Sequence, residues 1–245
     1  KLNFVYRIND QDKQAVFTIP VNTLSVQQSF YHAFDYKLLH LNPGDQVKYY
    51  FEVWDNDGVN GSKSTRTSSM VFRLPTRNEM EQMIEKNKEV IKDQLSDNID
   101  QLKDIDKSIK DLRKELMQKK DSDWNDKNKL QKLLEKQKDL LQKFEETKQL
   151  NEKNNKQENQ LTEEEKRILD KQKALEKLFE EIKNDELMKL LEEMEKSIEK
   201  LDKNKLQEMI NKFQMENNDL EKELDRTLEL FKQLEFEQKL ENAID

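Results

Sequence analysis

Glycine and proline are missing from more than two thirds of this chain. All three glycines and all three prolines lie in residues 1–75, and residues 76–245 contain neither. Because glycine and proline are the residues that most often interrupt regular structure, the longer segment is free to form long helices. We therefore expect a β + α segregated fold, with a turn-rich β segment in residues 1–75 and a helical segment after it.

Cysteine is absent, which excludes disulfides and thiolate metal sites. The only histidines are His32 and His40, and no pattern with metal-ligand spacing surrounds them. His32 is expected to pack on an aromatic face. The sequence also lacks a glycine-rich phosphate loop, a nucleophile motif and an apolar run of about 20 residues. We therefore expect no enzymatic activity, no cofactor and no transmembrane segment within these residues.

Charge is distributed unevenly along the chain. Residues 1–75 have a net charge of +1 and residues 76–245 a net charge of −9, for a total of −8. Charged residues make up 39% and apolar residues 33% of the chain, so the second segment can bury an apolar stripe but no large globular core. An acidic surface disfavours nucleic acids and anionic membranes. Proteins are therefore the expected partners, and the sequence leaves the oligomeric state open.

Five stretches of residues 1–75 alternate apolar and polar side chains, which is typical of strands. They suggest antiparallel sheets packed as a sandwich. The segment LNPGDQV, residues 41–47, resembles the turn before the sixth strand of immunoglobulin-like and fibronectin-like domains. The chain begins at Lys1 inside a strand pattern, so we expect a partial Ig-like sandwich whose first two strands lie upstream. The five predicted strands cover residues 2–8, 17–21, 30–36, 47–53 and 70–74.

One unusual string, residues 54–61 (WDNDGVNG), allows two interpretations. Asp55 and Asp57 are weak calcium-ligand candidates, because calcium prefers carboxylate and carbonyl oxygens. The string lacks the glutamate expected at the twelfth position of a helix–loop–helix calcium loop. We favour a hairpin loop in which Asp, Asn and Gly stabilise the turn.

Residues 84–116 carry a regular apolar pattern. Apolar residues recur at alternating spacings of four and three, which is typical of a coiled-coil seam. Lys88 and Asn98 are its two polar members, of the kind that fix helix register. The apolar seam, a candidate interaction surface, consists of Ile84, Ile91, Leu95, Leu102, Ile105, Ile109, Leu112 and Leu116.

Polar corners divide the helical segment. Residues 121–123 are expected to cap a new helix, with Trp124 filling the corner. Thr162 and Glu165 form a capping box, Asp202 is a further cap, and residues 218–221 offer a weak box. A continuous third helix is expected to carry apolar residues from Leu175 to Leu201.

These corners predict long antiparallel coiled-coil helical hairpins, the first in residues 76–160 and the second in residues 161–245. The hairpins can form a four-helix bundle or an elongated chain of antiparallel coils, and the narrow seam favours the thinner coil. Residues 151–160 (NEKNNKQENQ) contain no apolar side chain, so we expect a solvated helix end or a loop there.

Two strings carry a family resemblance. They are YYFEVWDNDGVNG, residues 49–61, which leads into KSTRT, and ELDRTLELFKQLE, residues 223–235. Together they resemble a domain-of-unknown-function family of large membrane-anchored envelope proteins of Bacteroidetes. The resemblance implies Ig-like domains, a long coiled-coil region, a membrane anchor outside this fragment and a place at the periplasmic face of the inner membrane. It implies no catalytic residues.

These observations support three functional hypotheses. The leading one is a non-enzymatic scaffold or adaptor of the bacterial envelope, in which the helical arm docks partner proteins and the β module positions it. The second is a chaperone-like or substrate-handling module of an envelope secretion or assembly machine, whose wide apolar face between Leu130 and Phe144 grips clients. The third is an accessory domain of a larger enzyme.

Overall fold

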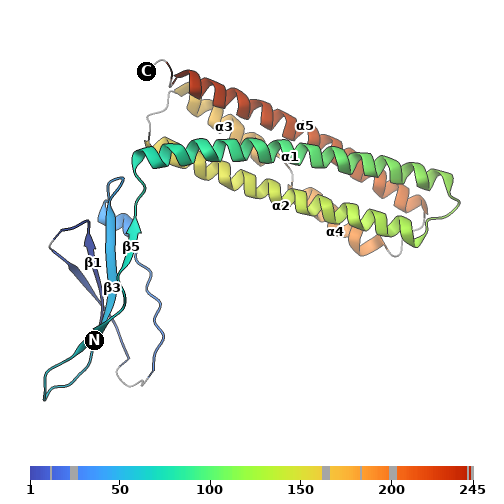
Figure 1. The fold of residues 1–245 in the computed structure, drawn as a ribbon. Helices are drawn as coiled ribbons and strands as arrows, with labels where there is room; N and C mark the ends of the chain where they lie inside the picture. The colour runs from blue at the N-terminus through green and yellow to red at the C-terminus, as the bar shows by residue number, and fades with distance from the viewer. Residues whose placement is uncertain are drawn as a thin grey trace. The chain divides into compact units, whose positions relative to one another are not determined.

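The computed structural model of the protein describes residues 1–11, 13–22, 27–161, 166–182, 184–198, 203–241 and 243, without the side chains of residues 184–186 and 197. The chain divides into two compact units, Lys1–Gln82 and Met83–Asp245. The expected order, an antiparallel β segment followed by long helices, is confirmed (Figure 1).

The first unit is built on an antiparallel sheet. Strand β1 lies between β2 and β3, and both β4 and β5 pair with β3 on the edge that β1 leaves free. One face of β1 presents Leu2 and Phe4, which form an apolar cluster with Ile19 of β2. Among the described residues the strands are β1 (Leu2–Ile8), β2 (Ala15–Ile19), β3 (Gln46–Trp54), β4 (Ser64–Arg66) and β5 (Met70–Arg73).

The strand predicted for residues 30–36 is wrong. Residues 28–35 form no strand, and a short 3-10 helix, η1 (Tyr36–Leu39), follows them. Alternate side chains of this segment nevertheless cover the apolar face of the sheet. The ring centroid of Phe34 lies 4.9 Å from that of Phe4, and the centroid of His32 lies 5.2 Å from it. The alternation therefore reflects contact with the sheet and not pairing within it, and the packing predicted for His32 is confirmed.

Strand β4 was not predicted, because its three residues are all exposed and carry no apolar alternation. It pairs with the end of β3 through Glu52, Val53 and Trp54. Backbone pairing alone therefore defines this strand.

The described part of the second unit contains only helices, together with short connections between them. None of the described helices combines the length and the apolar composition that crossing a bilayer requires. The helices are α1 (Arg77–Gln118), whose first residues belong to the first unit, α2 (Trp124–Leu161), α3 (Lys166–Glu181), α4 (Asn184–Ser197) and α5 (Lys203–Glu241).

The helices of the second unit run antiparallel to their neighbours. Along α1 and α2, Lys129 of α2 contacts Glu115 late in α1, whereas Glu158 near the end of α2 contacts Lys88 early in α1. Helices α3 and α4 follow one another along α2, because α3 contacts the end of α2 and Glu195 of α4 pairs with Lys138 at 2.5 Å. Helix α5 returns along α1 and α3 (Figure 1).

All five helices contribute to one apolar core, so they form a bundle. The eight seam residues predicted from spacing are all buried, and all but Ile84 belong to this core. The preference for a thinner coil is wrong, because α1 also buries Ile99 and Asp106 beside the seam. The wider buried face of α1 contacts α5 as well as α2: Asn217 of α5 donates to the carbonyl of Leu102 at 3.2 Å.

Several predicted helix ends differ from the structure. Asp123 caps α2, because its carboxylate accepts from the backbone N–H of Asp126 at 3.0 Å, and Asp126 accepts in return from the N–H of Asp123 at 3.0 Å. Trp124 does not fill the corner, since it is 72% exposed.

The third helix is divided, with α3 ending at Glu181, and residues 218–221 lie inside α5. Thr162, Glu165, Leu201 and Asp202 lie outside the described residues.

The start of α1 is fixed by a capping box that the sequence analysis missed. Thr76 Oγ1 accepts from the N–H of Glu79 at 3.3 Å, and Glu79 Oε2 accepts from the N–H of Thr76 at 2.8 Å. Arg73 of β5 donates to the other oxygen of Glu79 at 2.7 Å. The Arg73 hydrogen bond and the N–H of Thr76 lower the pKa of Glu79 to about 2. This carboxylate thus ties the last strand to the first helical turn.

We predict that Glu79→Gln lowers the urea midpoint, measured by far-UV circular dichroism, at pH 7. The pKa of Glu79 is depressed in the folded state, so its stabilisation is present above about pH 4.5 and is lost as the pH falls towards 2. The difference between wild type and variant should therefore shrink over that range. Glu81→Gln, which removes only an exposed pair with Arg77, is the control. A difference that does not change with pH would contradict the electrostatic origin.

Candidate functional site

The most organised group of polar side chains is a layer buried inside the helical bundle. It lies where the first half of α1 meets the ends of α2 and α5 and the middle of α3. Each member is less than a tenth exposed. This group, called the polar layer below, consists of Lys88, Asn151, Asn154, Asn155, Glu158, Gln172, Glu235 and Gln238.

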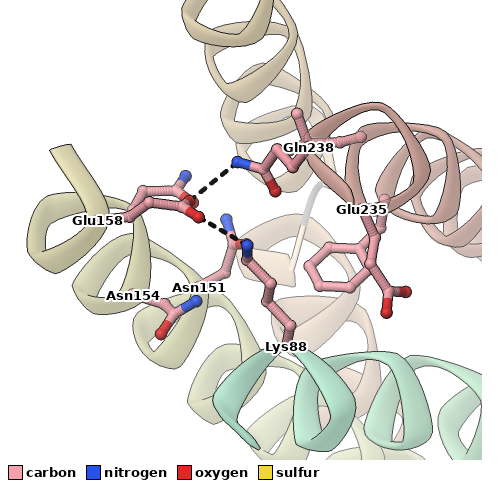
Figure 2. Close-up of a pocket in the computed structure, with 9 residues that line it drawn as sticks. Lys88, Asn151, Asn154, Glu158, Glu235 and Gln238 are labelled. Carbon is pink, nitrogen blue, oxygen red and sulfur yellow. Dashed lines mark hydrogen bonds and ion pairs between the residues drawn. The ribbon is translucent and has the colours of Figure 1, made fainter. Parts of the chain in front are cut away.

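Glu158 is the centre of the polar layer. Its Oε1 accepts from the ammonium of Lys88 at 2.6 Å. Its Oε2 accepts from the side-chain amides of Gln172 at 3.1 Å and Gln238 at 3.0 Å. Figure 2 shows the Glu158 carboxylate between Lys88 and Gln238. Since these residues belong to α1, α2, α3 and α5, one carboxylate joins four helices.

The charge on Lys88 follows from its surroundings. Burial alone would lower the pKa of Lys88, but attraction to Glu158, the hydrogen bond to Glu158 and the contact with Glu85 raise it above its ordinary value. Lys88 is therefore a protonated ammonium near neutral pH. An ammonium is no nucleophile, so this amine is suited to an ion pair and not to covalent catalysis.

The layer contains a second buried carboxylate with its own ion pairs. Glu235 of α5 accepts from Lys92 of α1 at 3.2 Å and from Lys239 at 2.6 Å. Burial raises the pKa of Glu235, but the hydrogen bonds from Lys239 and Lys92 outweigh it and lower the pKa overall. A second buried carboxylate thus connects α1 with α5.

The asparagines of α2 contribute polar contacts to α1 and α3. Asn154 donates to the carbonyl of Ile84 at 3.4 Å and accepts from Asn87 at 3.1 Å, and Asn155 donates to Glu176 of α3 at 3.1 Å. Two buried atoms of the layer, Asn151 Nδ2 and Gln172 Oε1, have no hydrogen-bond partner among the residues that the structure describes. The free space beside the layer is about 10 Å³. Such a space has the size of one water and is too small for an organic substrate.

Residues 151–160 are where sequence and structure differ most. The segment is the helical end of α2, so the expected helix end is confirmed and the alternative of a loop is wrong. The end is not fully solvated, because Asn151, Asn154, Asn155 and Glu158 are buried. A signal was present in the sequence. These four residues are spaced at positions i, i+3, i+4 and i+7, which is the spacing of one helix face. A search for apolar residues alone could not find it.

The loop that contains Asp55 and Asp57 has the contacts of a turn. Asp55 accepts from the N–H of Lys63 at 2.8 Å, and Asp57 accepts from the N–H groups of Val59 and Asn60, both at 3.0 Å. The backbone N–H groups of Asn60 and Val59 lower the pKa of Asp57. Both carboxylates therefore bind the backbone of their own loop. In the described ranges, no three His, Cys, Asp or Glu side chains are grouped to hold a metal ion.

The apolar face between Leu130 and Phe144 is occupied within the molecule. Leu130, Leu134, Leu140 and Phe144 are fully buried in the bundle core. Phe144 packs against Phe179 of α3, with ring centroids 5.5 Å apart. In this conformation the face is closed to a client protein.

A comparison with protein-family models found no match to this chain, and a comparison with curated proteins found none either.

We predict that Lys88→Met destabilises the protein by about 3–5 kcal/mol, because it leaves the Glu158 carboxylate buried without its cation. Lys88→Met combined with Glu158→Gln should recover most of the loss, since a neutral amide can still accept from Gln172 and Gln238. Free energies of unfolding from urea titrations measure both effects.

The matched control is Lys196→Met, which removes an exposed lysine paired with Glu192 in α4. Its effect should stay within about 0.5 kcal/mol. Equal effects of Lys88→Met and Lys196→Met would contradict the role assigned to the Lys88–Glu158 pair.

Proposed function

We propose that this region is a non-enzymatic structural and interaction element. The helical unit acts as a rigid spacer, and the β unit carries the surface that meets a protein partner. The observation that carries this proposal is the different use of apolar side chains in the two units. The helices bury their apolar faces in one shared core, whereas the sheet unit leaves many of its large apolar residues exposed.

The distribution of exposed residues supports this assignment. Among the described residues, nine of the fifteen exposed large apolar side chains lie in the first unit, which has 82 residues. Tyr31 and Val59 are more than 90% exposed. Large exposed apolar side chains mark interaction surfaces where they form a contiguous patch. The higher share of them in the first unit favours such a patch there over the helices. The first unit is therefore the better candidate for partner contact than the helical arm.

The chemistry of the polar layer favours a structural role over an enzymatic one. Its lysine is held as an ammonium, its central carboxylate is occupied by three donors, and its free space is that of one water. These properties favour fixed helix pairing and disfavour substrate turnover.

The finer description of the fold is part of the proposal. The antiparallel sheet with one aromatic face supports a partial Ig-like sandwich, and the buried 4,3 seam of α1 supports antiparallel coiled-coil hairpins. The place in a bacterial envelope protein rests on the resemblance of residues 49–67 and 223–235 alone. Other envelope proteins are the partners that this resemblance suggests.

The chaperone-like function is the second candidate, and surface variants separate the two. We predict that replacing Phe30, Tyr31 and Leu38 by serine reduces binding of an apolar dye and self-association measured by light scattering. The matched variant replaces the exposed Met117, Trp124 and Met215 of the helical unit by serine and should change neither. A loss of dye binding only in the helical variant would contradict the spacer and favour client binding.

A further inference from the structure

The second face of the sheet carries a hollow that none of the functions above uses. It lies on the side opposite the aromatic cluster, where Val5, Arg7, Lys48 and Tyr50 point away from the residues that alternate with them. Its volume is about 350 Å³, which is within the range of small-ligand sites. Its polar lining, called the cationic hollow below, consists of Arg7, Gln14, Lys48, Tyr50, Arg66 and Ser69.

Two cations stand directly opposite each other in this hollow. Arg7 of β1 is the cross-strand partner of Lys48 of β3. Like charges in opposite positions destabilise a sheet, because their side chains lie close together on one face. The arrangement therefore costs stability in the isolated protein.

Internal carboxylates neutralise the hollow only in part. Lys48 pairs with Asp10 at 2.9 Å, but Asp10 is 86% exposed, so water screens this pair. Within the described part of the chain, Arg7 forms no direct ion pair or side-chain hydrogen bond, although its charge also attracts the exposed carboxylate of Asp10. Arg66 lies over the ring of Tyr50, 5.4 Å from its centroid. Its cross-strand partner is Glu52, whose carboxylate accepts from the indole N–H of Trp54 at 2.7 Å and forms no direct ion pair with Arg66. Two guanidinium groups are thus available to an anion.

The neutral groups of the hollow suit a polyhydroxylated ligand. Gln14 accepts from the Tyr50 hydroxyl at 3.3 Å, and Ser69 adds a hydroxyl group beside the next strand. Guanidinium groups bind carboxylate and phosphate through paired hydrogen bonds. The hollow lies on a face of the sheet, over β1 and β3 and reaching Arg66 of the edge strand β4, whereas an extended peptide would add as a strand along the backbone of an edge. A small acidic ligand therefore fits better than an acidic peptide.

We propose that the cationic hollow binds a small sugar that carries a carboxylate or phosphate group, with Arg7 and Arg66 as the residues that bind the anion. This site goes beyond the function proposed above and does not depend on the helical unit acting as a spacer. Carboxylate and phosphate share the same recognition chemistry here, so the experiment uses both.

The test is calorimetric titration of the full chain with glucuronate and with glucose 6-phosphate. Uncharged glucose is the ligand control. At least one acidic sugar should bind, glucose should not, and Arg7→Gln or Arg66→Gln should each weaken binding by about tenfold, the loss expected for one charged hydrogen bond. Lys63→Gln removes an exposed cation outside the hollow and should leave the affinity unchanged.

A stability measurement makes the test independent of misfolding. Arg7→Gln also removes the repulsion with Lys48, so its urea midpoint should stay equal to that of wild type or rise while binding falls. The proposal is overturned if neither acidic sugar binds, if glucose binds equally, or if Lys63→Gln weakens binding as much as the arginine variants. Binding of a polyglutamate peptide without binding of either sugar would also overturn it.

Discussion

The register of the helices in the second unit depends on one buried carboxylate. Glu158 accepts hydrogen bonds from Lys88, Gln172 and Gln238, and through them α2 is connected to α1, α3 and α5 at a single level of the bundle. Burying this charge is costly unless every partner is in place. Leucine-rich helix faces can slide past one another at small cost, whereas a buried ion pair with two amide donors is satisfied in one register only. We infer that the polar layer selects the register of the helices. The apolar core then stabilises the bundle in that register.

The sequence predicted those parts of the fold that depend on regular apolar spacing. The strands 2–8, 47–53 and 70–74 and the seam from Ile84 to Leu116 were recognised, because each follows one clear period. The strand over residues 30–36 was a false prediction, since side chains that alternate against a sheet need no ladder of their own. The polar layer was missed because its members are hydrophilic, and the burial of Asn154 and Glu158 depends on hydrogen-bond partners 70 to 80 residues away in sequence. Long-range pairing of this kind leaves no local signal beyond the helical spacing of the polar residues themselves.

The two units differ in how far they pair their charged side chains and bury their apolar ones. The helical unit buries its charges in pairs and its apolar residues in a shared core, and its remaining surface is largely charged. The sheet unit keeps a pair of opposed cations, Arg7 and Lys48, and exposed aromatic residues, both of which reduce its own stability. Residues that cost stability without an internal partner are expected at sites of interaction. This contrast supports a rigid spacer joined to a unit that recognises ligands.

The most direct test of the register argument is a distance measurement by pulsed electron paramagnetic resonance. Because the chain has no cysteine, spin labels attach only at Met117→Cys in α1 and Met215→Cys in α5, two exposed positions on the bundle surface. The account predicts one narrow distance distribution for the labelled protein. It predicts a broader or multiple distribution when Lys88, Glu158, Gln172 and Gln238 are all replaced by leucine, even if the variant unfolds at a higher temperature. An unchanged narrow distribution in the leucine variant would contradict the claim that the polar layer selects the register.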